Sequence, residues 1–355
     1  MPSAKRAKPG PGRRAPAPVV VHSAPLVLPV CAEPIRDGAV AVMGDRVAGV
    51  GPRAEQLSSF PAAQEVRWTG MIVAGLIDAC STASPAAAPA APGVAPGVAP
   101  GVTARAGVVS GLTDPPRLPG ISYVEVGSAS EEEWEASERG AVITAIREID
   151  RPCAVGIAAH TPDPLVLEDV AVLARTFGLR LLADLGRHSP AALDEAGVLG
   201  PLCHVACARP LDPGERKLLR LRRTVVALCA WEPSPVGDVL ALLDEGNVVA
   251  LGTRAAGAVT SPLEVAGAIS RRARELGVRT RGLDRRLVEA ATLGGARALG
   301  MDKGAGRIGS LARGARADFA VFDARGRFPY AALIAQPPCL GTVVGGVLTP
   351  PPAPA

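Results

Sequence analysis

The sequence predicts an α/β protein: a (β/α)8 TIM-like barrel with a small β-sandwich domain formed by both chain ends. Three observations lead to this fold class. Short apolar strands alternate with amphipathic helices in the middle of the chain, eight such strands can be counted, and both ends show strand-like alternation instead. A doubly wound open sheet is the alternative, but no Gly-x-Gly-x-x-Gly turn follows the first strand to support a dinucleotide site.

Length and composition agree with one large domain and a smaller one. The chain has 355 residues, of which 48% are hydrophobic and 20% are charged. This composition excludes a wholly disordered chain. No run of eighteen apolar residues is present, which excludes a membrane-spanning protein. The net charge of +4 and an aromatic content of 3% do not indicate a nucleic-acid partner.

The two ends of the chain carry the β-sandwich pattern. Residues 39–43 and 46–50 alternate around a Gly44-Asp45 turn, which predicts a hairpin. Residues 318–323 alternate in the same way, and 342–344 turn through two glycines into 347–348. We therefore expect a composite domain made of residues 19–72 plus 306–350.

Residues 1–18 are rich in Pro, Arg, Lys and Gly, and we expect a disordered basic arm there. Arg13 and Arg14 before an apolar stretch resemble a twin-arginine export signal, but Pro16, Pro18 and His22 interrupt that stretch. The seven cysteines are scattered without a paired framework, which favours reduced thiols and a cytoplasmic protein.

The barrel is expected over residues 73–305. Its helices include 131–148, 164–177 and 262–276, and the acidic residues 131–133 suit a helix N-terminus. A Pro-Ala-Gly insert, 84–101, stands where the first helix belongs and cannot be helical, because proline removes backbone donors. The eight expected strands are 73–79, 102–109, 121–126, 153–158, 180–185, 203–207, 224–229 and 248–252.

Several motifs resemble the amidohydrolase superfamily. They are VAGLIDA at 73–79, VVALGT at 248–253, EAATLGGARALG at 289–300, IGSL at 308–311 and GARADF at 314–319. The chain is most similar to the aminohydrolase branch of cytosine and guanine deaminases, chlorohydrolases and aminofutalosine deaminases. The segments DRRLV at 284–288 and GISYVE at 120–125 favour the last of these.

The resemblance implies a metal-assisted hydrolysis of a ring C–N bond. Relatives hold one zinc or iron ion with His-x-His after strand one, a His after strands five and six, and an Asp after strand eight, while a Glu shuttles protons. Those ligand positions fall here on residues of other types. They are Cys80, Thr82, Asp184, Cys207 and Arg254.

The position of the acid/base glutamate falls on Arg187. Because arginine neither gives up its proton nor ligates metals, we expect no metal and no cofactor, and a guanidinium of Arg254 that pairs with Asp184 in place of the metal. Two alternatives remain open for the cysteines, a zinc site made of Cys80, Asp184 and Cys207, or a disulfide between the two thiols. Inert buried thiols are the simplest reading.

Three of the four histidines lie in the expected barrel. His160 resembles a strand-four histidine that contacts substrate or water in relatives, and we take it as the polar remnant of a catalytic site. Strand alternation places His204 on the face opposite Cys207, and His188 is expected to face solvent at a helix start.

By descent, the protein is thus a hydrolase of non-peptide C–N bonds that deaminates an aminopurine-like substrate such as aminofutalosine. Its present residues predict a catalytically degenerate member that binds a small purine-like molecule or a protein partner. An active hydrolase is the alternative. No nucleic-acid or membrane partner is expected, and the family suggests a homodimer.

Overall fold

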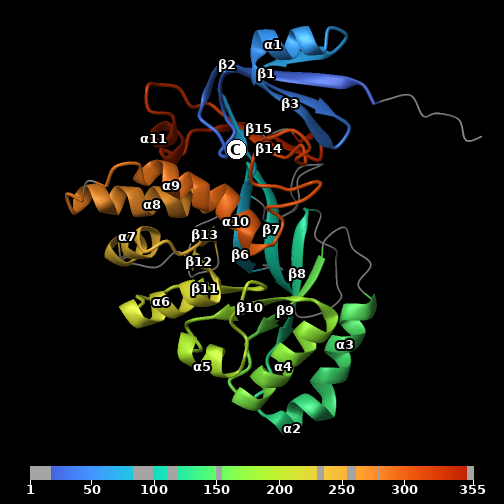
Figure 1. Cartoon of the computed structure of the whole chain (residues 1–355), viewed down its shortest axis with the longest axis vertical. Helices are drawn as coiled ribbons and strands as arrows, with labels where there is room; N and C mark the ends of the chain where they lie inside the picture. Colours follow the sequence, from blue (N-terminus) through green and yellow to red (C-terminus); the bar gives the residue numbers. More distant parts are fainter. Residues whose placement is uncertain are drawn as a thin grey trace, which may run out of the picture.

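The computed structural model describes residues 17–82, 99–109, 118–148, 154–229, 236–253, 261–278 and 280–349. Two sheets organise these residues, and Figure 1 shows the barrel below a sheet in which the first strands (blue) meet the last (red). No helix within these ranges is long and apolar enough to cross a membrane. The predicted α/β barrel with a separate β-structure made of the two chain ends is confirmed, but the expected β-sandwich is a single sheet.

The barrel consists of eight parallel strands in chain order, each paired with the next. The last strand packs against the first, so the sheet is nearly closed. The strands are β6 (Leu76–Thr82), β7 (Val102–Val109), β8 (Gly120–Val126), β9 (Ala154–Ala159), β10 (Arg180–Asp184), β11 (Cys203–Cys207), β12 (Val225–Cys229) and β13 (Val249–Gly252).

Helices connect the strands and cover the barrel. Their ends follow local rules: the Asp163 carboxylate accepts hydrogen bonds from two backbone N–H groups at the start of α4, and Gly178 ends that helix in the left-handed conformation. The helical elements are α2 (Glu131–Glu133), η1 (Trp134–Glu138), α3 (Arg139–Glu148), α4 (Pro164–Phe177), α5 (Pro190–Glu195), α6 (Pro213–Arg222), α7 (Val236–Asp244), α8 (Pro262–Glu275), α9 (Leu283–Glu289), η2 (Ala290–Gly294) and α10 (Gly295–Ala298).

The strands from both chain ends form one sheet, ordered β16-β15-β14-β5-β1-β2-β3 with β4 beside β1, instead of two facing sheets. It curls back on itself, because Ala317 N donates to Asp45 O at 2.8 Å and Gly346 N donates to Ala317 O at 2.9 Å. Its elements are β1 (Val19–Leu28), β2 (Ile35–Met43), β3 (Arg46–Pro52), α1 (Arg53–Ser59), β4 (Gln64–Arg67), β5 (Met71–Ala74), β14 (Phe319–Phe322), α11 (Pro329–Ile334), β15 (Cys339–Val344) and β16 (Val347–Thr349).

One predicted strand divides between the two sheets. The expected strand 73–79 is split at Gly75, so that β5 belongs to the end sheet and β6 to the barrel. A side chain at Gly75 would lie 2.1 Å from Thr103 Oγ1, which explains why a glycine makes the crossing. Only the end of the 84–101 insert is described; there Gly101 N donates to Thr342 Oγ1 at 2.9 Å.

The apolar core has two layers. Large aliphatic side chains fill the space between strands and helices, whereas the barrel interior is filled mainly by small ones. The interior alanines leave room for the Tyr123 ring, which is fully buried. They are Ala79, Ala104, Ala106, Ala158, Ala206, Ala227 and Ala250.

Candidate active site

The carboxyl ends of the barrel strands, which we call the barrel mouth, are where reactive groups lie in this fold. The two-residue period of a strand decides which side chains reach the mouth. On β8, Ile121 and Tyr123 lie in the inner cluster, so Glu125 is the next inward residue. On β9, Ala158 lies in the inner cluster and His160 continues that row just beyond the strand.

Glu125 and His160 form a hydrogen-bonded pair across these two strands. His160 Nδ1 lies 2.8 Å from Glu125 Oε1, and the His160 backbone N donates to Val126 O at 3.0 Å. The imidazole is 3% exposed, while the Glu125 side chain is 38% exposed. The carboxylate therefore orients a buried ring and keeps its own outer edge accessible at the mouth.

The turn after β10 brings Arg187 beside this pair. Asp184 ends the strand, its Oδ1 accepts from Gly186 N at 2.8 Å, and its carbonyl oxygen accepts from the N–H groups of Arg187 and His188. The exposed Arg187 reaches back, and its Nη1 lies 3.4 Å from His160 O. Arg187 and His160, the two residues predicted for the catalytic site, are thus neighbours; their roles remain predictions.

His188 does not face solvent, contrary to the sequence prediction. It is 9% exposed, and its Nε2 is buried without a hydrogen-bond partner within the described ranges. The reason is the tight turn at Asp184, which folds the backbone of His188 against the strand end before Ser189 caps helix α5. A helix start need not be exposed when the preceding turn is this short.

Asp78 on β6 is a buried carboxylate whose structural role the sequence motifs did not indicate. Its Oδ1 accepts from Cys80 N at 3.2 Å and from Thr253 N at 3.0 Å, and its Oδ2 accepts from Thr253 Oγ1 at 2.6 Å. Burial raises the pKa of this carboxyl, while the hydrogen bonds from Thr253 and Cys80 act in the opposite direction. A carboxylate inside an otherwise apolar strand was the available signal.

These hydrogen bonds close the barrel between its first and last strands. Gly252 lies against Cys80 there: a side chain at this position would approach the Cys80 Cβ to 2.9 Å. Both oxygens of Asp78 accept hydrogen bonds where the first and last strands meet. This carboxylate therefore stabilises the barrel instead of facing a ligand.

Cys207 does not point into the barrel. Cys203, Val205 and Cys207 belong to the outer cluster, and Cys207 Sγ lies 3.2 Å from Arg209 O. Cys80, by contrast, lies in the inner cluster. The alternative of a disulfide between the two thiols is therefore wrong: both are free and buried, because alternation along β11 directs Cys207 toward the helices.

His204 and Cys207 lie on opposite faces of β11, as predicted, but the directions are reversed: His204 faces inward, and Cys207, expected at a ligand position, faces outward. The Nε2 of His204 lies 2.9 Å from Ala79 O, and its Nδ1 lies 3.4 Å from the Tyr123 hydroxyl. Burial, with a smaller effect of nearby Arg180, lowers the pKa of His204 to about 3, so the ring is neutral. It ties β11 to β8 and β6 inside the barrel.

Two of the positions at which relatives have metal ligands lie wholly or partly outside the described residues. Arg254 lies outside the described residues, and so does its predicted pairing with Asp184. Nothing is described of the Thr82 side chain. In the part of the chain that is described, no three His, Cys, Asp or Glu side chains lie close enough together to hold a metal ion. The described residues at the former ligand positions therefore do not form the metal centre that the family resemblance implies.

Comparisons with known proteins agree with this architecture. Residues 191–349 match the amidohydrolase family, which confirms the resemblance over that part of the chain. A search of curated proteins finds no match. Among solved structures, an adenosine deaminase from Xanthomonas campestris with bound zinc has a TM-score of 0.71 at 18% identity, over 94% of this chain and 93% of the other.

Two further structures share the fold. The atrazine chlorohydrolase TrzN from Arthrobacter aurescens TC1, complexed with zinc, has a TM-score of 0.70 at 16% identity, over 95% of this chain and 97% of its own. The aminofutalosine deaminase of Helicobacter pylori has a TM-score of 0.72 at 14% identity, over 93% and 100%. At these identities the likeness shows the fold alone.

The zinc in two of these structures contradicts the prediction that no cofactor is to be expected. That prediction came from counting substituted ligand positions along the sequence. The comparisons show that structures of this fold contain the metal, so the substitutions by themselves do not exclude it.

Proposed function

We propose that this protein is an amidohydrolase-fold protein, by descent a hydrolase of non-peptide C–N bonds, that binds a small purine-like molecule at the barrel mouth without deaminating it. The observation that carries the proposal is Arg187 beside the Glu125–His160 pair. The resemblance assigns a proton-shuttling glutamate to that position, and a guanidinium cannot accept the proton that this step requires.

The same groups suit recognition of a flat heterocycle. Glu125 offers an accessible carboxylate edge that accepts hydrogen bonds from ring or exocyclic N–H groups. Arg187 is exposed and donates to ring nitrogen or carbonyl acceptors. A purine presents both kinds of edge. In a related fold, the aminofutalosine deaminase of Helicobacter pylori, the bound molecule is methylthio-coformycin, which supports a nucleoside-like ligand.

An active hydrolase is the second candidate. It is favoured by the neighbours of the same fold, which include an adenosine deaminase and a chlorohydrolase. In this case a purine-like substrate would lose its amino group to water and release ammonia. Nothing in this candidate specifies which residues of the present chain would carry the proton.

Ligand binding and turnover separate the two candidates. Thermal unfolding is followed with methylthio-coformycin and with adenosine, and ammonia release is measured from adenosine and guanine, each with and without added zinc. Stabilisation without ammonia supports binding without turnover. Ammonia release above the rate of a heat-denatured sample overturns the proposal, and so does the absence of any stabilisation.

Two variants test the residues. Glu125→Gln and Arg187→Ala should each weaken binding roughly tenfold, as expected for one charge-assisted hydrogen bond. Arg325→Ala serves as the matched control, because Arg325 is exposed and its ion pair is with Asp323 outside the barrel mouth. Equal affinities in all three variants would place the ligand elsewhere.

A cytoplasmic location agrees with the six described cysteines, all of which are free thiols, and it forms part of the proposal.

A further inference from the structure

A cavity lies away from the barrel mouth, on the outside of the barrel. It has a volume of about 400 Å³ and is bounded by the last turns of α8, the segment that follows it, and the first turns of α9 and α11. This volume is within the range of small-molecule sites. It shares no residue with the Glu125–His160–Arg187 group, so an inference drawn from it does not rest on the proposed function.

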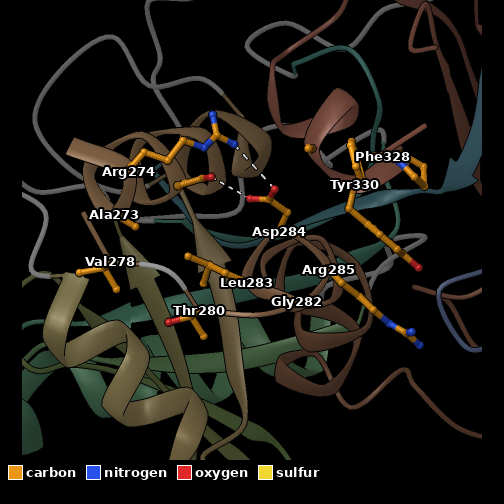
Figure 2. Close-up of a pocket in the computed structure, with 13 residues that line it drawn as sticks. Ala273, Arg274, Val278, Thr280, Gly282, Leu283, Asp284, Arg285, Phe328 and Tyr330 are labelled. Atoms are coloured by element: carbon orange, nitrogen blue, oxygen red, sulfur yellow. Dashed lines mark hydrogen bonds and ion pairs between the residues drawn. The ribbon is translucent and has the colours of Figure 1, made fainter. Parts of the chain in front are cut away.

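The walls of this cavity are apolar on several sides. Ala273 and Leu283 are buried and form part of the lining, and Val278 joins them from the segment after α8. Figure 2 shows Phe328 and Tyr330 on the opposite side from Val278. The Phe328 ring remains 70% exposed, which is unusual for so large an apolar side chain at a cavity edge.

An acid and a base stand side by side in the lining. Asp284 Oδ1 accepts from Ser270 Oγ at 2.7 Å, while Asp284 Oδ2 faces Arg274 Nη2 at 3.7 Å (Figure 2). That separation is wider than a hydrogen bond. Ser270 therefore fixes the carboxylate, and the outward oxygen and the guanidinium keep capacity for further partners. Their side chains are 28% and 60% exposed.

Arg285, in the same lining, provides a contrast. Its guanidinium donates to Glu33 at 2.9 Å and to Glu289 at 3.1 Å, and it lies 5.9 Å from the centre of the Tyr330 ring. These contacts fix Arg285 as part of the wall. Among the described residues of the lining, the loosely paired Arg274 and Asp284 are the charged groups that a ligand would meet.

We infer that this cavity binds an α-amino acid with an apolar side chain. The ligand carboxylate would pair with Arg274 and the ligand ammonium with the outward oxygen Oδ2 of Asp284, so both charges would gain a partner at hydrogen-bond distance. The apolar side chain would lie against Ala273, Leu283 and the aromatic rings, where it leaves water. A simple anion or a simple cation would interact favourably with only one member of the charged pair.

Matched ligands test the requirement for both charges. We would titrate the full-length protein with L-phenylalanine, 3-phenylpropionate and phenethylamine by calorimetry; the second lacks the ammonium group and the third lacks the carboxylate. L-phenylalanine should bind at least roughly tenfold more tightly than either. Equal affinities for the three, or no binding of L-phenylalanine, would overturn the inference.

Variants then locate the site. Arg274→Gln and Asp284→Asn should each weaken L-phenylalanine binding by about tenfold or more, and Asn at 284 can still accept from Ser270. Arg272→Gln is the control, since Arg272 lies on the same helix, is exposed and pairs with Glu275. Thermal unfolding verifies that each variant folds. Unchanged affinity in both test variants would show that the amino acid binds elsewhere.

Discussion

The barrel mouth and the outer cavity both contain acidic and basic groups, but they use them differently. At the mouth, Asp78 accepts three hydrogen bonds, two of which join β6 to Thr253 after β13, and Glu125 lies 2.8 Å from a buried imidazole. In the cavity, the Arg274–Asp284 contact is 3.7 Å long and partly exposed. Polar groups at the mouth therefore contribute to stability, whereas those of the cavity are held loosely.

This difference teaches where each kind of residue can be changed. A buried carboxylate that satisfies several N–H and O–H groups leaves all of them unsatisfied when it is removed. An exposed ion pair contributes little to the free energy of unfolding. The following changes are ordered from the largest expected effect on stability to the smallest.

Replacing Asp78 should have the largest effect. Asp78→Ala leaves the Cys80 N–H group and the partly buried Thr253 N–H and hydroxyl groups without their acceptor, so the free energy of unfolding should fall by about 3 to 5 kcal/mol. Urea unfolding followed by circular dichroism measures this change.

Asp78→Asn is the informative partner of that variant. Burial raises the pKa of Asp78, so its neutral form is favoured more than usual, and an amide keeps one acceptor oxygen. The loss should be clearly smaller than for alanine. Equal losses in the two variants would show that the hydrogen bonds at the strand seam do not stabilise the barrel.

Acid should destabilise the protein through its buried histidines. Burial lowers the pKa of His204 to about 3 and that of His22 to about 4, both below the ordinary value of 6.5. In this pH range the unfolded chain binds protons at these histidines and the folded chain does not. The free energy of unfolding therefore falls as the pH drops from 6.5 toward these values. Each histidine contributes up to about 1.4 kcal/mol per pH unit.

Asp318 works in the opposite direction. Burial raises its pKa from 3.8 to about 6, so the folded chain holds a proton that the unfolded chain releases, and stability rises as the pH falls through this interval. His204→Gln isolates one contribution: the slope of stability against pH should be reduced by nearly one proton around pH 5, and hardly at all at about pH 7.5. An unchanged slope would mean that His204 is not the titrating group.

Removal of the Glu125 carboxylate should have an intermediate effect. Glu125→Ala takes away the partner 2.8 Å from the buried His160 Nδ1, and the free energy of unfolding should fall by about 1 to 2 kcal/mol. Glu125→Gln retains an acceptor and should cost less. A larger loss in the glutamine variant than in the alanine variant would contradict the role of this hydrogen bond.

Arg274→Gln should have the smallest effect on stability, within about 0.5 kcal/mol, because its only close ion pair among the described residues is long and exposed. Urea unfolding of this variant beside Asp78→Ala completes the comparison between cavity and mouth. A loss comparable with that of Asp78→Ala would show that the cavity pair is structural.

Much of the architecture was predictable because apolar periodicity directly reports which face of an element is buried. Helix α4 begins and ends at the expected residues, and strands β7 and β11 match their expected ranges. The expected first barrel strand, 73–79, begins too early. An apolar run does not reveal that residues 73 and 74 pair with the end sheet. The strand pairing shows that the chain changes sheets at Gly75, where a side chain would collide with Thr103.

The sequence by itself determined the fold class, the placement of His204 and Cys207 on opposite faces of one strand, and the arginine at 187. These follow from periods of two and of about 3.6 residues and from residue chemistry. Tertiary structure decided that Cys207 faces the helices, that His188 is buried and that Asp78 is bound to Thr253. The physical reason is that a register or turn of one residue redirects a side chain, and contacts between strands distant in sequence fix that register.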